Sequence, residues 1–175
     1  LSRGLGDVYK RQHLDPLFIQ QSPSIALGQA KEEVLRMGEF AVKGLEETKE
    51  FFNTKQAKHA QSAFQIEDAI NNLDRKITDY LIELSATTLS EQESEEHHML
   101  MDTVRDIERI GDHFENLVEL GEYQQSNRVK ISEAAMADLT EMLDLTISTV
   151  KESITALGEN NEGAARRCLL YTSDA

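Results

Sequence analysis

The sequence predicts an all-α protein of long antiparallel helices, a three-helix bundle followed by the start of a second bundle. Apolar residues recur at steps of three and four along four long segments, which is the pattern of amphipathic helices. Only two prolines, no tryptophan and 6% aromatic residues favour helix over sheet. The breaks between the first three segments are short, and long helices joined by short turns pack antiparallel.

Composition limits the function classes. The chain carries 32 acidic and 18 basic side chains, a formal net charge of −14, and such a surface repels nucleic acid and anionic lipid headgroups. No run of about 18 apolar residues that could span a bilayer is present. The one cysteine, Cys168, cannot form an internal disulfide, which fits a reducing compartment. We therefore expect no nucleic-acid partner and a fragment that is itself soluble.

Both chain ends look foreign to the rest. Residues 1–12 (LSRGLGDVYKRQ) and 168–175 (CLLYTSDA) resemble peptides translated from sequencing-adapter DNA, so we exclude them from the fold prediction. We expect the natural protein to extend in both directions beyond residues 13–167.

The first predicted helix follows a linker. Residues 13–22 include Pro16 and show no helical periodicity, so we expect an extended linker from an upstream region. The Ser22 hydroxyl can cap free amides, and Pro23 suits the first helical position. The apolar stripe then predicts a helix from about Ser24 to about Phe52.

Two more helices follow. Asn53 and Thr54 end the first helix and can cap the second, whose stripe ends near Ser85. The outer face of the second helix is expected to be solvated and holds Glu67, Asp68, Asp74, Arg75 and Lys76. Ser90 and Glu93 form a capping box that opens the third helix, which fades near Glu122.

The segment 124–130 is polar and has no apolar period, which predicts a boundary between two units there. Ser132 can cap a fourth helix, and Gly158 is a stop signal for it. We assign residues 23–123 to a three-helix bundle and 131–167 to the start of a second repeat.

The third helix carries the candidate metal ligands. Asp102 with Asp106, and Glu108 with Asp112, stand four residues apart, where helix geometry brings two carboxylates within reach of one cation. The same spacing is common on solvated faces: the sequence holds six such acidic pairs, about the number that chance gives. Spacing alone therefore leaves both interpretations open.

A short motif occurs twice. Residues 35–39 read LRMGE and residues 108–112 read ERIGD, with Gly38 and Gly111 on the core-facing stripes, where a glycine permits close helix approach. We expect the first and third helices to pack in related environments. The sequence has no phosphate loop, cysteine cluster, catalytic-triad signature or nucleotide fingerprint, so we predict a binding or regulatory module and no enzyme.

These motifs resemble a known family. RDIERIGDHFENLVE (105–119) resembles the signature helix of PhoU-type domains, and residues 24–48 are similar to the first helix of such domains. Residues 13–39 are similar to the junction that, in bacterial sodium/phosphate cotransporters, leads from the last membrane segment into a cytoplasmic PhoU-like tail.

The resemblance implies tandem three-helix bundles that regulate phosphate uptake and signalling, in some members with iron or zinc bound by Glu/Asp-x-x-x-Asp motifs. Glu108 and Asp112 match that motif, and Asp102 and Asp106 fit its spacing. Two positions depart from it: Asn71, four residues after Glu67, is not acidic, and neither is Leu35, four residues before Glu39.

Three functions remain open at this point. The first is the regulatory domain of a sodium-dependent phosphate cotransporter, at the cytoplasmic face of the membrane, with the upstream transporter domain as its partner. The second is a free-standing PhoU-type regulator that binds iron or zinc, and the third is a ligand-free helical interaction module. A second copy of the chain and a signalling protein are further expected partners.

Overall fold

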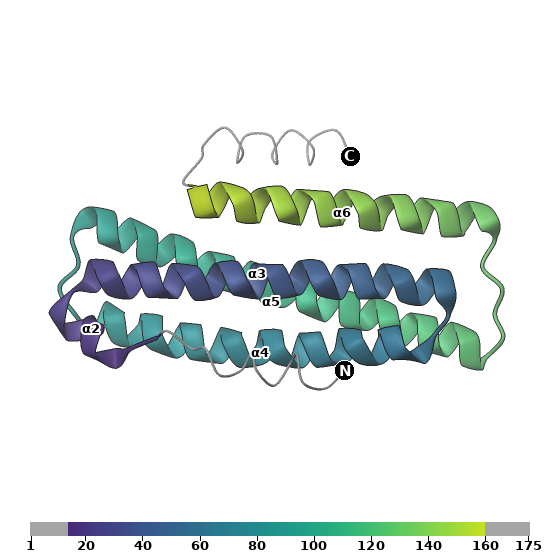
Figure 1. Ribbon diagram of the computed structural model, residues 1–175, viewed down its shortest axis with the longest axis horizontal. Coiled ribbons are helices and arrows are strands. Elements are labelled where there is room, and N and C mark those ends of the chain that lie inside the picture. The colour runs from purple at the N-terminus through teal and green to yellow at the C-terminus, as the bar shows by residue number, and fades with distance from the viewer. Residues whose placement is uncertain (1–13, 160–175) are drawn as a thin grey trace.

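The computed structural model describes residues 14–159, and its elements are all helices: α2 (Pro16–Gln21), α3 (Pro23–Thr54), α4 (Ala57–Ser85), α5 (Glu91–Ser126) and α6 (Glu133–Glu159). The four long helices run side by side with alternating direction (Figure 1). The predicted all-α architecture of long antiparallel helices is therefore confirmed for the described part of the chain.

The core lies where α3, α4 and α5 pack against one another. Its largest fully buried side chains come from all three helices at the predicted three- and four-residue steps, and they include Phe51, Phe114, Leu27, Met37, Ile70, Ile77, Leu81 and Leu100. Each of the three helices thus presents one apolar stripe to the other two.

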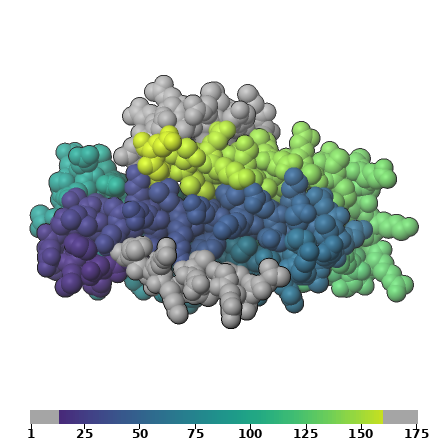
Figure 2. Space-filling view, in the orientation of Figure 1, coloured from purple at the N-terminus to yellow at the C-terminus, as the bar shows by residue number. Residues whose placement is uncertain are grey.

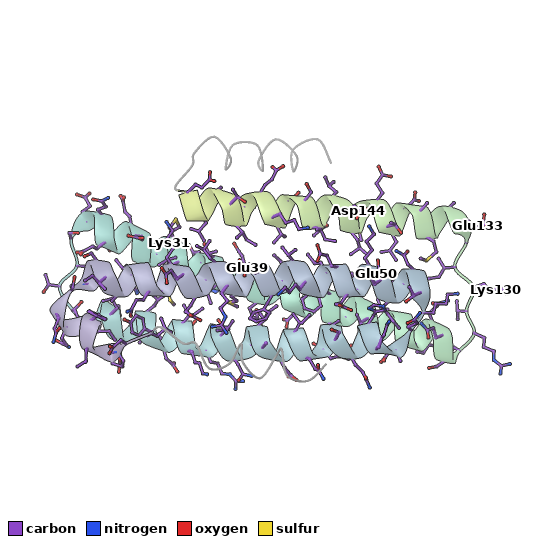
Figure 3. The ribbon with its side chains drawn as sticks, in the orientation of Figure 1. Lys31, Glu39, Glu50, Lys130, Glu133 and Asp144 are labelled. Carbon is purple, nitrogen blue, oxygen red and sulfur yellow. The ribbon has the colours of Figure 1, made fainter. Side chains whose placement is uncertain are left out.

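Helix α6 packs against α3 and against no other described helix. It lies along α3 over one face of the molecule (Figure 2), burying Leu143 and Ile147. Two ion pairs join the helices at the edges of this contact, Lys49 Nζ with Asp144 Oδ1 at 2.5 Å and Lys151 Nζ with Glu46 Oε1 at 2.8 Å. Figure 3 shows α6 with Asp144 alongside α3 with Glu39 and Glu50. The assignment of α6 to a second repeat stays a prediction.

The linker expected to be extended is partly helical. Asp15 accepts a hydrogen bond from the Leu17 amide at 3.0 Å, and Pro16 begins α2, where a proline's missing N–H costs nothing. Ile19 is only 3% exposed and belongs to the core. The extended conformation was wrong because the five residues after the capped proline form a short helix that is stabilised by burying Ile19 in the bundle.

Two helix termini agree with the predictions, whereas two predicted caps do not form. The capping box of Ser90 and Glu93 is present, and α4 ends at Ser85. Ser22 is the N-cap residue of α3, but its side chain makes no capping hydrogen bond. Thr54 does not cap α4 either, because its hydroxyl donates to the Glu50 carbonyl at 2.7 Å, and Gln56 is the N-cap.

The ends of α5 and α6 also differ from the prediction. Helix α5 continues to Ser126, past Glu122, and Gly158 lies within α6. Residues 1–13 and 160–175, including both adapter-like ends and the last part of the expected second repeat, lie outside the described residues. No described helix has the length and hydropathy of a membrane span.

The two motif glycines face different helices. A Cβ atom added to Gly38 would lie 2.7 Å from Cγ1 of Ile154 on α6, whereas one added to Gly111 would meet Ile70 Cγ2 on α4 at 3.4 Å. The expectation of related environments was therefore wrong. Sequence similarity between the two motifs shows that both permit close approach, but not which neighbour approaches.

Candidate acidic site between α4 and α5

Three carboxylates meet between α4 and α5. Oxygen atoms of Glu67 on α4 and of Asp112 and Glu115 on α5 lie within 4.8 Å of one another. Glu67 is only 5% exposed, Glu115 is half-buried and Asp112 is exposed. The group therefore reaches from the helix interface to the surface.

Local sequence explains why Glu67 is buried. Ala63 and Ile70 belong to the apolar stripe of α4, and Glu67, four residues after the first and three before the second, lies at the edge of that stripe. Gly111 of α5 lies opposite: a Cβ atom there would be 3.9 Å from Glu67 Cγ. The stem of Glu67 therefore packs beside Gly111, the residue before Asp112, and its carboxylate lies next to those of Asp112 and Glu115.

The pKa values of these groups are raised by their surroundings. Burial, followed by the carboxylate of Glu115, raises the pKa of Glu67, and a hydrogen bond donated by Asn71 opposes this effect. Burial, followed by Glu119 and Asp112, raises the pKa of Glu115. The folded chain therefore disfavours the ionised form of both groups.

Such a group has the chemistry of a cation site. Carboxylate oxygens are ligands for hard and borderline cations, and a bound cation offsets the repulsion among the three negative charges. None of the three forms an ion pair with a basic side chain in the described part of the chain. The donor set, one buried and two more accessible carboxylates from two helices, fits an iron or zinc ion as well as a harder cation.

Of the four predicted metal ligands, one belongs to this group and three lie outside it. Asp112 belongs to it. Glu108 lies one turn before Asp112 and is half-buried, and burial, then Asp112 and Asp74, raise its pKa while Arg109 opposes the rise. Asp102 and Asp106 are exposed, and Asp102 Oδ1 lies 3.9 Å from Arg105 Nη1. The metal-binding role of the two pairs stays a prediction.

Sequence reasoning missed Glu67 and Glu115 as members of one site. We expected Glu67 on a solvated face, and this was wrong because the helix turns it toward the apolar stripe. For Glu115 a usable signal existed in the spacing: it lies three residues after Asp112 and so shares a helix face with a predicted ligand.

The family comparison covers the same bundle. The family model described as the PhoU domain matches residues 34–121, half of the 175-residue chain. The match runs from α3 through α4 and most of α5, and it includes all three carboxylates of the acidic site. No curated protein and no solved structure matches the chain significantly. With its bundle spanned by this model, the chain belongs to the PhoU domain family, a family of phosphate-transport regulators rather than enzymes.

Proposed function

We propose that this chain is the regulatory domain of a sodium-dependent phosphate cotransporter and modulates phosphate uptake from the cytoplasmic face of the membrane. Membership of the PhoU family carries the regulatory part of the proposal. The cotransporter part is supported by the similarity of residues 13–39 to the junction between membrane segment and cytoplasmic tail in such transporters.

The hydrogen bonds of Asp15, within the junction of residues 13–39, support a mechanical connection between the bundle and an upstream domain. The Asp15 amide donates to Gln29 Oε1 at 3.0 Å, and the Tyr80 hydroxyl donates to the Asp15 carbonyl at 3.0 Å. Since Gln29 lies on α3 and Tyr80 on α4, chain entering from upstream is fixed to two helices of the bundle. A change in the bundle can therefore reach the chain that enters at Asp15, and through it an attached transporter domain.

The gene upstream of residue 13 tests this proposal. We expect it to encode several membrane-spanning helices that continue in frame into α2. An upstream region without membrane spans would contradict the cotransporter assignment and favour a free-standing regulator.

A second candidate is a free-standing PhoU-type regulator that binds iron or zinc and acts on a phosphate transporter and its signalling partner. The observation that favours metal binding is the group of Glu67, Asp112 and Glu115, with oxygens within 4.8 Å. The third candidate is a helical interaction module without a ligand.

Metal analysis separates the last two candidates. Purified chain is loaded with iron or zinc, dialysed and assayed for bound metal, alongside the double variant Glu67→Gln/Asp112→Asn and the matched control Asp79→Asn/Glu83→Gln on the exposed face of α4. A metal-binding regulator retains metal in the parent and control and loses it in the first variant. The interaction module retains no metal in any of the three.

A further inference from the structure

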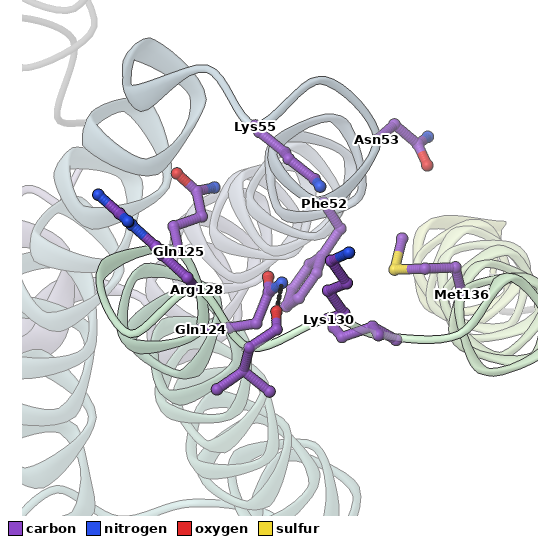
Figure 4. Close-up of a pocket in the computed structure, with 10 residues that line it drawn as sticks. Phe52, Asn53, Lys55, Gln124, Gln125, Arg128, Lys130 and Met136 are labelled. Carbon is purple, nitrogen blue, oxygen red and sulfur yellow. Dashed lines mark hydrogen bonds between the residues drawn. The ribbon is translucent and has the colours of Figure 1, made fainter.

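An open cavity of about 670 Å³, most of whose lining residues are exposed, lies at the surface of the bundle where α3 and α5 finish and α6 begins. Its lining comes from the last turn of α3, the end of α5 and the connection to α6 (Figure 4). The aromatic ring of Phe52 and the thioether of Met136 contribute apolar surface, and Asn53, Gln124 and Gln125 contribute amides. This volume is typical of cavities that hold small organic ligands.

The charge of the cavity is opposite to that of the chain. Lys55, Arg128 and Lys130 line it, and none of its described lining residues is acidic, although the whole chain carries a formal charge of −14. None of the three cations forms an ion pair with a described residue. The cavity therefore has a positive local potential, whereas the net negative charge of the whole chain repels anions.

Two of these cations occupy strained backbone positions. Lys55 has φ 58° and Arg128 has φ 54°, and they are the non-glycine residues with positive φ in the described chain. A helix that ends in the left-handed conformation usually places glycine there, because a side chain is unfavourable at positive φ. Here the helix ends carry long cationic side chains at that cost, and backbone strain of this kind clusters at ligand sites.

The cationic groups are not equivalent. In Figure 4 the ammonium ends of Lys55 and Lys130 extend toward the same space beside Phe52, whereas Arg128 extends away from them past Gln125. The connection that carries Lys130 is held by a hydrogen bond from Gln124 Nε2 to the Val129 carbonyl at 2.5 Å and by one from the Val129 amide to the Gln124 carbonyl at 3.0 Å. Two lysines from different segments are therefore presented on a fixed backbone.

The negative ends of the dipoles of α3 and α5 do not cancel the positive charge of the cavity. The C-terminal carbonyls of α3 and α5 lie near the cavity and would oppose an anion, but several already accept backbone hydrogen bonds, Phe51 from Lys55 and Tyr123 from Asn127. The side chain of Asn127 also donates to the Tyr123 carbonyl at 2.9 Å.

We propose that this cavity binds a small phosphorylated anion between Lys55 and Lys130. Two ammonium groups that form no ion pair with a described carboxylate suit a multiply charged phosphoryl group better than a single carboxylate, since lysine binds phosphate as a point charge and arginine supplies the bidentate fork. The source is either free phosphate or a phosphate ester with an aromatic body, such as a nucleotide, which Phe52 would contact. The proposal goes beyond the regulatory assignment and does not depend on it.

Calorimetric titration of the full chain tests the site, with magnesium-free ATP in one arm and inorganic phosphate in the other, at low ionic strength and with a chelator present. Sub-millimolar binding in either arm is the expected result. ATP binding at least about tenfold tighter than phosphate assigns a contribution to Phe52, whereas equal affinities point to free phosphate, and both support the site. No binding of either anion up to millimolar concentration overturns the proposal.

Variants locate the binding and keep the fold intact. Lys55→Gly removes a cation and places glycine at a left-handed position, so we expect affinity to fall about tenfold while the melting temperature rises by about 2–4 °C. Lys130→Gln should weaken binding by a similar factor. Lys76→Gln is the matched control: it removes the same charge from an exposed position on α4 that does not line the cavity, so it should change affinity less than about threefold. Equal losses in Lys55→Gly, Lys130→Gln and Lys76→Gln would show unspecific attraction and overturn the proposal.

Discussion

The ring of Phe114 on α5 fills the space that a side chain on Gly44 of α3 would occupy. Phe114 is fully buried, and Gly44 lies in the middle of α3. A second contact of the same kind lies near the C-terminal ends of the two helices. There a Cβ atom on Gly121 of α5 would lie 2.6 Å from Cε1 of Phe51 on α3. The close contact between α3 and α5 therefore depends on a glycine of one helix facing a phenylalanine of the other, in both directions.

Replacement of Gly44 tests that contact. Gly44→Ala inserts a methyl group into the Phe114 ring, and we expect the free energy of unfolding to fall by about 1–3 kcal/mol, as for other overpacked cores. The matched control is Gly28→Ala in the same helix, where no heavy atom lies within 4 Å of the added Cβ. Alanine should stabilise that position by about 0.5–1 kcal/mol. Chemical denaturation measures both, and an equal effect of the two variants would contradict the packing account.

Because Glu67 lies in the acidic site, replacing it with a neutral residue should raise the free energy of unfolding by an amount that depends on pH. Burial and Glu115 raise its pKa in the folded chain, so its contribution to stability is full below the unfolded pKa and is lost as pH rises through the folded pKa. Without added metal, Glu67→Gln should therefore raise the free energy of unfolding at neutral pH. The gain should vanish near about pH 4, where the parent carboxyl is protonated.

The control for that experiment is Asp79→Asn, an exposed carboxylate on the same helix, which should leave stability nearly unchanged across the range. A gain from Glu67→Gln that is the same at both pH values would show that ionisation of Glu67 is not what costs stability.

The start of α5 depends on the capping box. Ser90 Oγ accepts from the Glu93 amide at 3.3 Å, and Glu93 Oε2 accepts from the Ser90 amide at 2.8 Å. Ser90→Ala should lower the free energy of unfolding by about 1 kcal/mol. Ser94→Ala, one turn further on and exposed, should be neutral or slightly stabilising because alanine is the better helix former. Thermal unfolding of the two variants provides the comparison.

Helix α6 should loosen independently of the bundle. It packs on α3 alone among the described helices, and Leu143 at 2% exposure is its most buried side chain. Leu143→Ala removes about 2–5 kcal/mol of packing energy from that contact. Amide hydrogen exchange should therefore accelerate within residues 133–159 and change little in α4. Met142→Ala, at a position 51% exposed, should have little effect, and uniform acceleration across all helices would show that α6 unfolds only with the bundle.

Periodicity predicted most of the fold because each bundle helix buries one continuous stripe. The stripe from Ala63 to Leu84 located α4, and its end at Ser85 agrees with the structure. The segment around Pro16 was less predictable, since one helical turn is too short to show a period and becomes helical only by burying Ile19.

The acidic site was predictable only in part. Asp112 was found because it belongs to the ERIGD motif, whose glycine marks a close approach. Glu67 was not found, because its burial depends on which helix packs opposite Gly111, and a single sequence does not contain that pairing. The cavity at the end of the bundle was missed for the same reason: Lys55 and Lys130 are far apart in sequence, and only the return of α5 to the end of α3 brings them together.

The regulatory assignment is tested most directly by sodium-driven uptake of radiolabelled phosphate into cells that express the full-length protein. Uptake is compared between the intact protein and a version that lacks the sequence from Ser22 onward, at matched amounts in the membrane. The account predicts that removing the bundle changes the uptake rate, or its response to phosphate supply, by at least about twofold, an energetic effect of roughly 0.4 kcal/mol. Sodium-driven uptake that is identical in rate and in phosphate response with and without the bundle would contradict it.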